Sequence, residues 1–195
     1  MADNNRVSRA LPASQSVAIV LVVAMAENRV IGRDNALPWR LKSDMQRLRD
    51  ITWGKPVVVG RTTFLSFTRK PLPGRTNIVL SRSKSFDAPG TLVASRLDAA
   101  LEAARGDALR RGVATIIVLG GADVYAQTMP VADRLLITRV HLKADGDTSF
   151  PPIDPRVWRE TERSEHPAGP DDDASYTTVD YERHATPFES PQGRS

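Results

Sequence analysis

The fold is decided by the stretch Thr115-Ile116-Ile117-Val118-Leu119-Gly120-Gly121-Ala122-Asp123. Its first five residues are apolar or β-branched with no polar alternation, which is typical of a strand buried on both faces of a parallel sheet. Two glycines end this strand, and residues 123–129 continue as a helix that Pro130 stops. A buried strand that passes through glycine directly into a helix is the repeating unit of α/β domains.

The same alternation of strand and helix is predicted along the rest of the chain. We expect strands at 17–26, 56–60, 77–80, 91–94 and 134–140, and late, antiparallel strands near Trp158 and at 176–181. Helices are expected from Ser43 to about Ile51, from Arg61 to about Phe67 and after Ser95, and Ser43 and Ser95 are the expected N-caps. These elements predict an α/β domain around a largely parallel sheet, with ligands beyond the carboxyl ends of the strands.

Length and composition suit one globular domain with short tails. The chain has 195 residues, of which 41% are hydrophobic and 26% are charged. Residues 1–16 are polar and residues 185–195 have little to bury, so we expect both segments to be disordered and the folded domain to span residues 17–184. The sequence has no cysteine, which excludes disulfides and thiol catalysis and fits the reducing cytoplasm.

The apolar segment 17–26 admits two interpretations. Arg6 and Arg9 precede it and it ends in Ala24-Met25-Ala26, which resembles a secretory signal with its cleavage site. The segment is too short for a transmembrane helix. It is also rich in β-branched residues and leads into the turn-like pair Glu27-Asn28, as a buried central strand would. We favour the strand, because the motifs described next require it.

The charge pattern leaves another class of protein open. The net charge is +4, and the 27 basic residues include only five lysines, so arginine dominates. Arginine binds phosphate and carboxylate through a planar fork of donors, and an arginine-rich chain can be a non-catalytic nucleic-acid-binding protein. No basic run is longer than Arg110-Arg111, however. We therefore favour a solvated basic surface and expect no nucleic-acid partner and no membrane association.

Three strand ends carry residues that suit a phosphate-bearing cofactor. Glycines follow the apolar runs 57–59 and 115–119 and open helices, where glycine lets a phosphate approach the backbone at a helix N-terminus. Leu80-Ser81-Arg82-Ser83 follows a third strand and, with Arg61, supplies hydroxyls and two guanidinium groups. Such a set fits an adenosine 2′-phosphate, whereas a bare ribose hydroxyl would favour an acidic residue. Each turn alone could be purely structural, and the two glycine turns together could hold the two ends of a dinucleotide.

The segment from Ile31 to Asp44 carries the remaining chemistry. Glycine, asparagine and proline indicate a mobile loop, on which Leu37 and Trp39 are large apolar groups. Asp44 begins the helix that follows. A first-turn acid can simply match the helix dipole, so this segment alone does not assign a function to Asp44.

Six motifs occur in order and are together highly specific: Asn28-Arg29-Val30-Ile31-Gly32, Leu37-Pro38-Trp39-x-Leu41-x-x-Asp44, Val59-Gly60-Arg61-x-Thr63, Pro71-Leu72-Pro73-Gly74-Arg75-x-Asn77, Leu119-Gly120-Gly121 and Gly146-Asp147-Thr148-x-Phe150-Pro151. Over residues 17–184 the chain resembles the bacterial, chromosomal dihydrofolate reductase family. The resemblance implies a three-layer domain with a central, mostly parallel eight-stranded sheet, an antiparallel C-terminal strand and four flanking helices. It also implies a monomeric, cytoplasmic oxidoreductase that uses NADPH, reduces dihydrofolate and binds antifolate inhibitors.

By the same resemblance, the substrate pocket is centred on Asp44, the family's single buried carboxylate. Asp44 would pair with the pterin's amidine-like edge, and its pKa should be raised because the cleft is apolar. Thr138 would support Asp44 by a hydrogen bond, and Arg75 would clasp the α-carboxylate of the glutamate tail. The expected catalytic residues are Asp44, Leu37 and Trp39, the last two on a loop that closes over the nicotinamide. The other expected substrate contacts are Val22, Val23, Met45, Leu48, Phe67, Leu119 and Tyr125.

The resemblance also places NADPH along the glycine turns and implies a cis bond between Gly120 and Gly121. Arg61, Ser81 and Arg82 would bind the 2′-phosphate. Thr62, Thr63 and the turn 120–124 would hold the pyrophosphate. The full set of expected cofactor contacts is Ala24, Ile31, Gly32, Leu37, Gly60, Arg61, Thr62, Thr63, Leu80, Ser81, Arg82, Gly120, Gly121, Ala122, Asp123 and Val124. No metal is expected.

Three departures from the family pattern and one rival enzyme bear on these assignments. Leu48 stands where an aromatic residue is common, and Ala122 stands where many members have a third glycine. The run 68–70 is one residue longer than the commonest bacterial pattern, so Arg69 is left without an assigned contact.

The rival is the reductase of riboflavin synthesis, which reduces a ribosylamino-pyrimidine on a similar fold. The pocket of that enzyme has no need for the Leu37-Pro38-Trp39 loop with Asp44, or for Arg75. Because this chain has these residues, we favour dihydrofolate as the substrate.

Overall fold

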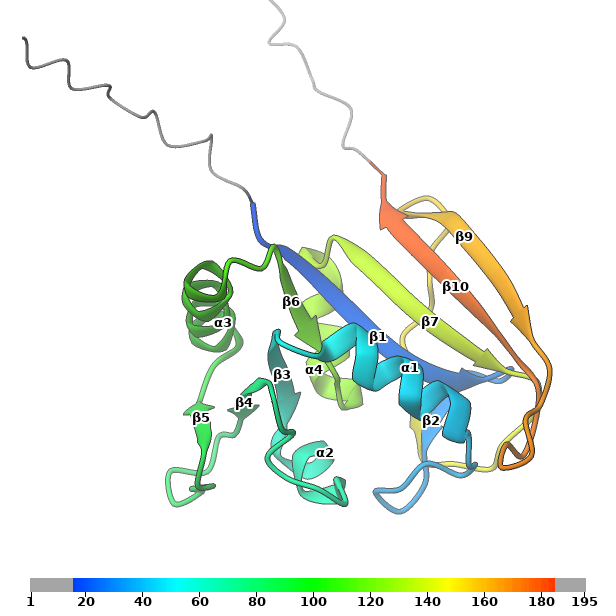
Figure 1. The fold of residues 1–195 in the computed structure, drawn as a ribbon, viewed down its shortest axis with the longest axis horizontal. Helices are drawn as coiled ribbons and strands as arrows, with labels where there is room; N and C mark the ends of the chain where they lie inside the picture. Colours follow the sequence, from blue (N-terminus) through cyan, green and yellow to red (C-terminus); the bar gives the residue numbers. More distant parts are fainter. Residues whose placement is uncertain (1–15, 185–195) are drawn as a thin grey trace, which may run out of the picture.

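Eight strands form the central sheet of the computed structural model, which describes residues 16–184 (Figure 1). In spatial order they are β5 (Thr91–Ala94), β4 (Thr76–Leu80), β3 (Pro56–Gly60), β6 (Thr115–Val118), β1 (Ala18–Ala26), β7 (Arg134–Val140), β10 (Tyr176–Arg183) and β9 (Trp158–His166). Within the described residues, β10 alone runs antiparallel to both of its neighbours. The predicted sheet and the strand interpretation of residues 17–26 are confirmed. The tails predicted at 1–16 and 185–195 lie, apart from Ser16, outside the described residues.

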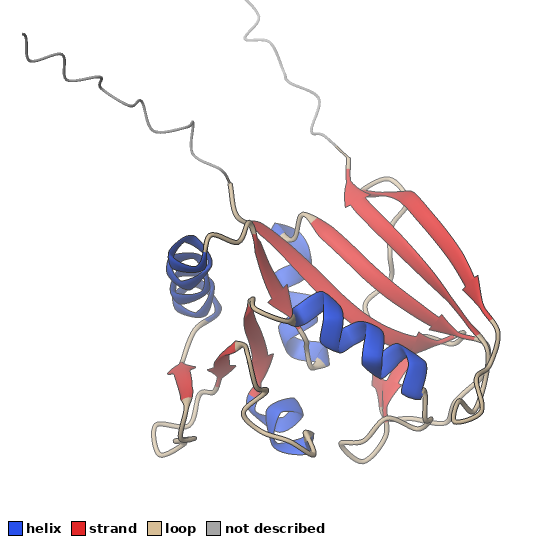
Figure 2. Cartoon of the chain, in the orientation of Figure 1, coloured by secondary structure: helices blue, strands red, loops and turns tan. Residues whose placement is uncertain are grey.

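Four helices cover the two faces of this sheet in the described part of the chain (Figure 2). They are α1 (Lys42–Thr52), α2 (Arg61–Ser66), α3 (Leu97–Arg111) and α4 (Ala122–Thr128), and a 3₁₀ turn at Met129–Val131 follows α4. The predicted three-layer α/β fold is confirmed. Among residues 16–184, no helix has the length and apolar character needed to span a membrane.

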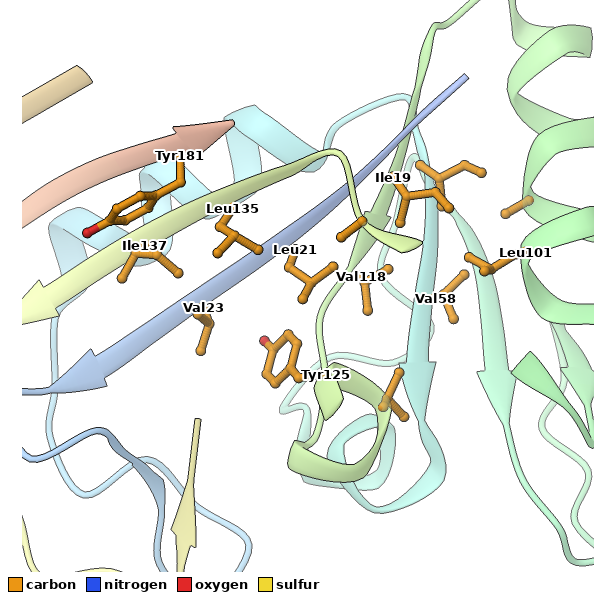
Figure 3. Packing of buried hydrophobic residues seen from close by; sticks show 14 of the residues in the cluster. Ile19, Leu21, Val23, Val58, Leu101, Val118, Tyr125, Leu135, Ile137 and Tyr181 are labelled. Atoms are coloured by element: carbon orange, nitrogen blue, oxygen red, sulfur yellow. The ribbon is translucent and has the colours of Figure 1, made fainter. Parts of the chain in front are cut away.

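The central strand β1 separates two hydrophobic cores. Because side chains alternate along a strand, Leu21 lies in one core with Leu101 of α3 and Tyr125 of α4 (Figure 3). The next residue, Val22, lies in the other core with Phe64 of α2. Strand β1 is thus buried on both faces, and its later residues reach the carboxyl edge of the sheet between β6 and β7.

A second, two-stranded sheet organises the loop before α1. Strand β2 (Val30–Gly32) pairs antiparallel with β8 (Thr148–Ser149). A tight turn from Arg33 to Ala36 follows, in which Asp34 and Asn35 have positive φ angles of 51° and 63°. The sequence analysis did not anticipate this sheet, because its strands are only three and two residues long. It ties the loop at 31–36 to the distant segment around Thr148.

Both predicted serine N-caps are wrong. Helix α1 begins at Lys42, and Ser43 lies inside it, where Asp172 from the loop before β10 accepts hydrogen bonds from the Ser43 backbone N–H (3.2 Å) and hydroxyl (2.6 Å). Helix α3 begins two residues after Ser95, and the residue at its N-cap, Arg96, makes no capping hydrogen bond and pairs with Asp98. The first helix start is thus supported by a carboxylate 129 residues away, which a local pattern does not reveal.

Candidate active site

A large cleft opens across the carboxyl edge of the sheet, with a volume of about 1700 Å³. A pocket for one drug-sized ligand usually measures roughly 300–1000 Å³, so this cleft has room for two ligands side by side. The expected site residues that line it are Val22, Val23, Ala24, Ile31, Gly32, Leu37, Asp44, Met45, Leu48, Gly60, Arg61, Thr62, Thr63, Phe67, Arg75, Leu80, Ser81, Arg82, Leu119, Gly121, Ala122, Asp123, Val124, Tyr125 and Thr138. Of the expected residues, Trp39 and Gly120 do not line it.

Asp44 is a charged residue that the fold buries almost completely. Its position in the first turn of α1 directs it toward β7, where the Thr138 hydroxyl donates a hydrogen bond of 2.7 Å to Oδ1. Burial raises the pKa of Asp44, against the opposing effects of the Thr138 hydrogen bond and the Arg47 guanidinium. The expected hydrogen bond from Thr138 is therefore present, and the burial of Asp44 gives its pKa the expected direction. Within the described residues, Oδ2 has no recorded hydrogen-bond partner.

Apolar side chains form the cleft walls on either side of Asp44. Leu37 and Met45 line the cleft and are about half exposed (49% and 53%). Large apolar groups that remain this open in a concave site are typical of a surface that a ligand covers. The Tyr125 hydroxyl donates a hydrogen bond of 2.7 Å to the backbone carbonyl of Val22. Burial raises the pKa of Tyr125, so this hydroxyl stays protonated and fixes a carbonyl of the cleft wall.

Trp39 lies differently from the expectation. Its side chain is only 5% exposed and packs in a third apolar cluster with Ala26, Val140 and Tyr176, outside the cleft lining. The loop residue that reaches the cleft is Leu37, two positions earlier. Trp39 therefore anchors the loop to the sheet. It does not line the cleft, so its position does not support the catalytic role expected for it.

Arg75 occupies the end of the cleft beyond Phe67 and is held in place by the protein. Its Nε donates to the Pro73 carbonyl (3.0 Å) and its Nη1 donates to the Thr52 hydroxyl (2.8 Å). Burial, with a smaller contribution from the nearby Arg49 charge, lowers the pKa of Arg75. The guanidinium groups of Arg75 and Arg49 both lie over the Trp53 ring, at 5.7 Å and 5.4 Å from its centroid. The sequence analysis missed Arg49 and Trp53, although their i, i+4 spacing on α1 places them on one face.

Two glycine turns meet at the other end of the cleft. The Gly60 N–H donates to the Gly120 carbonyl (2.6 Å), and the Gly120-Gly121 bond is cis, as the resemblance implied. A Cβ at Gly60 would lie 3.1 Å from Val124, and a Cβ at Gly121 would lie 2.9 Å from the Thr63 hydroxyl. The two turns are thus packed closely against each other, and a side chain at either glycine would crowd its neighbours. Gly60 and Gly121 are partly buried and line the cleft.

The arginine-rich corner lies in the same cleft. Arg61, Ser81 and Arg82 all line it, and the Arg61 guanidinium lies 5.9 Å from the centroid of the Phe86 ring. Ser95 and Arg96 line it as well and were missed in the sequence analysis. A signal existed, because they follow β5 just as Ser81 and Arg82 follow the neighbouring β4, and parallel strands end at the same edge of the sheet.

A variant tests whether the tight glycine turn belongs to the cofactor end of the cleft. We expect Gly121→Ala to weaken NADPH binding about tenfold, since its Cβ would lie 2.9 Å from Thr63 Oγ1 and push the turns apart. Titration of NADPH by fluorescence measures the change in Kd. Gly106→Ala is the matched control, because no atom lies within 4 Å of a Cβ built there in α3. Wild-type affinity in a folded Gly121→Ala protein would separate this turn from the cofactor.

Comparisons with known proteins agree with this geometry. The model of the dihydrofolate reductase family matches residues 18–183. The chain is 46% identical to dihydrofolate reductase type 3 of Salmonella typhimurium over 158 residues, covering 81% of this chain and 92% of that protein. It is 43% identical to a dihydrofolate reductase of Neisseria meningitidis over 166 residues, covering 85% and 98%. A dihydrofolate reductase from Enterococcus faecalis, solved with NADP(H) and RAB-propyl, superposes with a TM-score of 0.76 at 28% identity, covering 87% and 98%. The chain therefore belongs to the dihydrofolate reductase family.

Proposed function

We infer that this chain reduces 7,8-dihydrofolate to 5,6,7,8-tetrahydrofolate with NADPH, which supplies the one-carbon carrier for thymidylate and purine synthesis. The observation that carries this inference is one cleft with two unlike ends. A buried carboxylate, Asp44, stands in an apolar pocket at one end, and paired glycine turns beside Arg61 and Arg82 stand at the other. Family membership and the NADP(H)-bound relative support the same reaction.

Asp44 is proposed to hold the pterin by paired, charge-assisted hydrogen bonds. Thr138 fixes Oδ1 at 2.7 Å, which restricts the carboxylate to one orientation. The backbone carbonyls of Val22 and Leu119 are proposed to face the same ring, and Met45, Leu48 and Phe67 are proposed to wall the pterin and its benzoyl group. Preorganised groups of this kind favour the transition state because they need not reorganise during the reaction.

The residues at the glycine turns fit a phosphorylated dinucleotide. A Cβ would crowd Val124 at Gly60 and the Thr63 hydroxyl at Gly121, so glycine at both positions keeps room beside the N-termini of α2 and α4, where we propose that the pyrophosphate binds. Arg61, Ser81 and Arg82 are proposed to bind the 2′-phosphate, and Ala24, Ile31, Gly32 and Leu37 to contact the nicotinamide. NADPH would supply the hydride. The protein's part is to align the two rings and to exclude water with the loop that carries Leu37.

Asp44 is the buried carboxylate among the described residues that line the cleft, and on family geometry it faces the pterin edge opposite the nitrogen that must gain a proton. We therefore propose that water delivers the proton to that nitrogen while Asp44 polarises the ring. Protonation makes the imine carbon electrophilic, and the hydride then adds to that carbon.

We expect the rate of hydride transfer to fall as pH rises through neutrality, since the protonated pterin becomes scarce. A second limb is expected on the acid side. Burial raises the pKa of Asp44, so its ionised form is lost at a higher pH than for an ordinary carboxyl. Single-turnover rates measured from about pH 5 to 9 test both limbs. A chemical step with no pH dependence over this range would contradict the assigned proton route.

The function is tested by mixing the protein with NADPH and dihydrofolate and following the loss of reduced-nicotinamide absorbance, with NADH as the comparison. Rapid loss with NADPH and slow loss with NADH is expected, because Arg61 and Arg82 recognise the 2′-phosphate. A folded protein that binds NADPH but leaves dihydrofolate unreduced would favour the ribosylamino-pyrimidine of riboflavin synthesis. Binding of nucleic acid that weakens steeply with salt would favour the non-catalytic alternative.

We also propose that the enzyme is a monomer in the cytoplasm and binds antifolate inhibitors at the Asp44 end of the cleft. The cysteine-free sequence is consistent with a reducing compartment. Sedimentation at micromolar concentration distinguishes a monomer of 21.4 kDa from a dimer.

A further inference from the structure

A chain of charged groups begins beside Asp44 with Arg47, which also lines the cleft, and continues on the face of the sheet that α1 covers. Arg47 stands one helical turn after Asp44, and its Nη1 lies 4.0 Å from Asp44 Oδ1. The same guanidinium reaches β10, where Nη2 lies 3.8 Å from Asp180 Oδ1. Its Nη1 also donates a long hydrogen bond of 3.5 Å to the hydroxyl of Thr138, which itself hydrogen-bonds Asp44. Arg47 thus bridges the site carboxylate and a second acid.

The strand register explains why this second acid is available. Strands β7 and β10 pair antiparallel with Thr138 opposite Thr178 and Leu136 opposite Asp180. Side chains two residues apart point to the same face, so Asp180 stands on the Thr138 side of the sheet, under α1. It is mostly buried, and burial raises its pKa against the Arg134 and Arg47 charges. Arg134 holds its other oxygen at 3.3 Å.

We propose that Arg47, held between Asp44 and Asp180, is a positioning residue that sets how strongly the charge of Asp44 acts on the bound pterin. The proposal rests on the proposed function for its effect on hydride transfer, though not for its effect on Asp44 itself. Arg47 places a cation on the carboxylate that must hold the pterin edge, and Asp180 neutralises part of that cation. The pair therefore adjusts the net charge beside Asp44.

The sign of the effect follows from the groups that face Asp44. Arg47 on α1 and His166 on β9 lower the pKa of Asp44, and Asp172 in the loop before β10 raises it. Thr138 on β7 contributes a hydrogen bond that also lowers it. Asp180 is not in contact with Asp44 and acts through Arg47.

Two single variants should therefore shift the pKa values of Asp44 and of the bound pterin in opposite directions. Arg47→Met keeps the apolar stem and removes the cation, so the pKa of Asp44 rises and the pterin is protonated more readily. Asp180→Asn removes the partner acid and leaves the Arg47 cation uncompensated, so both titrations move to lower pH. We expect each shift to be at least about 0.5 pH unit, which is about a threefold change at a fixed pH on a titrating limb. When Asp180→Asn is added to Arg47→Met, it should shift the titrations little further, because Asp180 acts through the Arg47 cation.

The first measurement is the titration of the Asp44 carboxyl by carbon-13 NMR in the ligand-free protein, with the resonance assigned by Asp44→Asn. It reports on Arg47 and Asp180 without any catalysis. The second is the pH dependence of single-turnover hydride transfer in the same variants. Arg105→Met is the matched control, because it removes the same charge from an exposed position of α3, on the opposite face of the sheet.

Shifts of opposite sign in the two single variants, absent in Arg105→Met, support the proposal. Shifts of the same sign, or shifts no larger than the control, overturn it, and so does a loss of rate without a shift of either titration. If Arg47→Met fails to fold, Arg47→Gln provides the test, since it also removes the charge and should move both midpoints to higher pH. A wild-type protein that does not reduce dihydrofolate would instead overturn the proposed function, and the carboxyl titration would still decide the role of Arg47.

Discussion

The Asp44→Asn variant is expected to lose about 2–4 kcal/mol of transition-state stabilisation, or roughly 30- to 700-fold in kcat/KM for dihydrofolate. Asparagine keeps the shape and can still accept the 2.7 Å hydrogen bond from Thr138, but it removes the charge that we propose to pair with the pterin edge. Steady-state kinetics with saturating NADPH measure the loss. NADPH affinity should remain near wild type, because Arg61 and the glycine turns lie at the other end of the cleft.

A matched control for this variant lies on the same helix. Asp50 is exposed on α1 and accepts a hydrogen bond from Gln46, so Asp50→Asn makes the same chemical change away from the pocket. Its kcat/KM should stay within about twofold of wild type, as is usual for surface substitutions. Activity of folded Asp44→Asn within tenfold of wild type would show that the role assigned to Asp44 is wrong.

The second large effect is expected at Arg75. Arg75→Met should raise the KM for dihydrofolate by about 100-fold with little change in kcat, since a bidentate guanidinium–carboxylate pair is lost at the glutamate end, away from the reacting ring. Arg75 is suited to this pair because Pro73 and Thr52 already orient its guanidinium. Kinetics over a wide range of substrate concentration separate the two parameters.

A truncated substrate provides the control for Arg75. A dihydropterin that lacks the glutamate tail has no carboxylate for Arg75, so wild type and Arg75→Met should reduce it at equal kcat/KM. An equal loss with both substrates would mean that the substitution damages the cleft in general. A KM for dihydrofolate that does not change would remove Arg75 from the substrate site.

Much of the backbone could be predicted because its signals are local. Apolar runs such as 115–119 followed by glycine specify a strand, a turn and the start of a helix within a few residues, and β3 and β6 follow this rule. The position of the cleft residues at the strand ends could also be predicted, because parallel strands end at the same edge of a sheet. Family-like motifs then brought Asp44, Arg75 and the glycine turns into one site, where the structure finds them.

The features that could not be predicted depend on contacts between distant segments. Trp39 reads as a loop residue, yet Ala26, Val140 and Tyr176 supply a cluster that buries its ring. The start of α1 depends on Asp172, which no local capping pattern around Ser43 reveals. The bridge from Arg47 to Asp180 requires the register of β10 against β7, and a helix surface arginine looks the same in sequence with or without it.

The central claim is that this cleft delivers hydride from NADPH to the pterin ring, and a single turnover with NADPH carrying deuterium at the transferable position tests it most directly. The account predicts that the tetrahydrofolate formed contains one deuterium, detected by mass spectrometry as a product one mass unit heavier than that from unlabelled NADPH. It further predicts that Asp44→Asn slows the appearance of this product. Dihydrofolate that stays unreduced, or tetrahydrofolate without the label, would contradict the account.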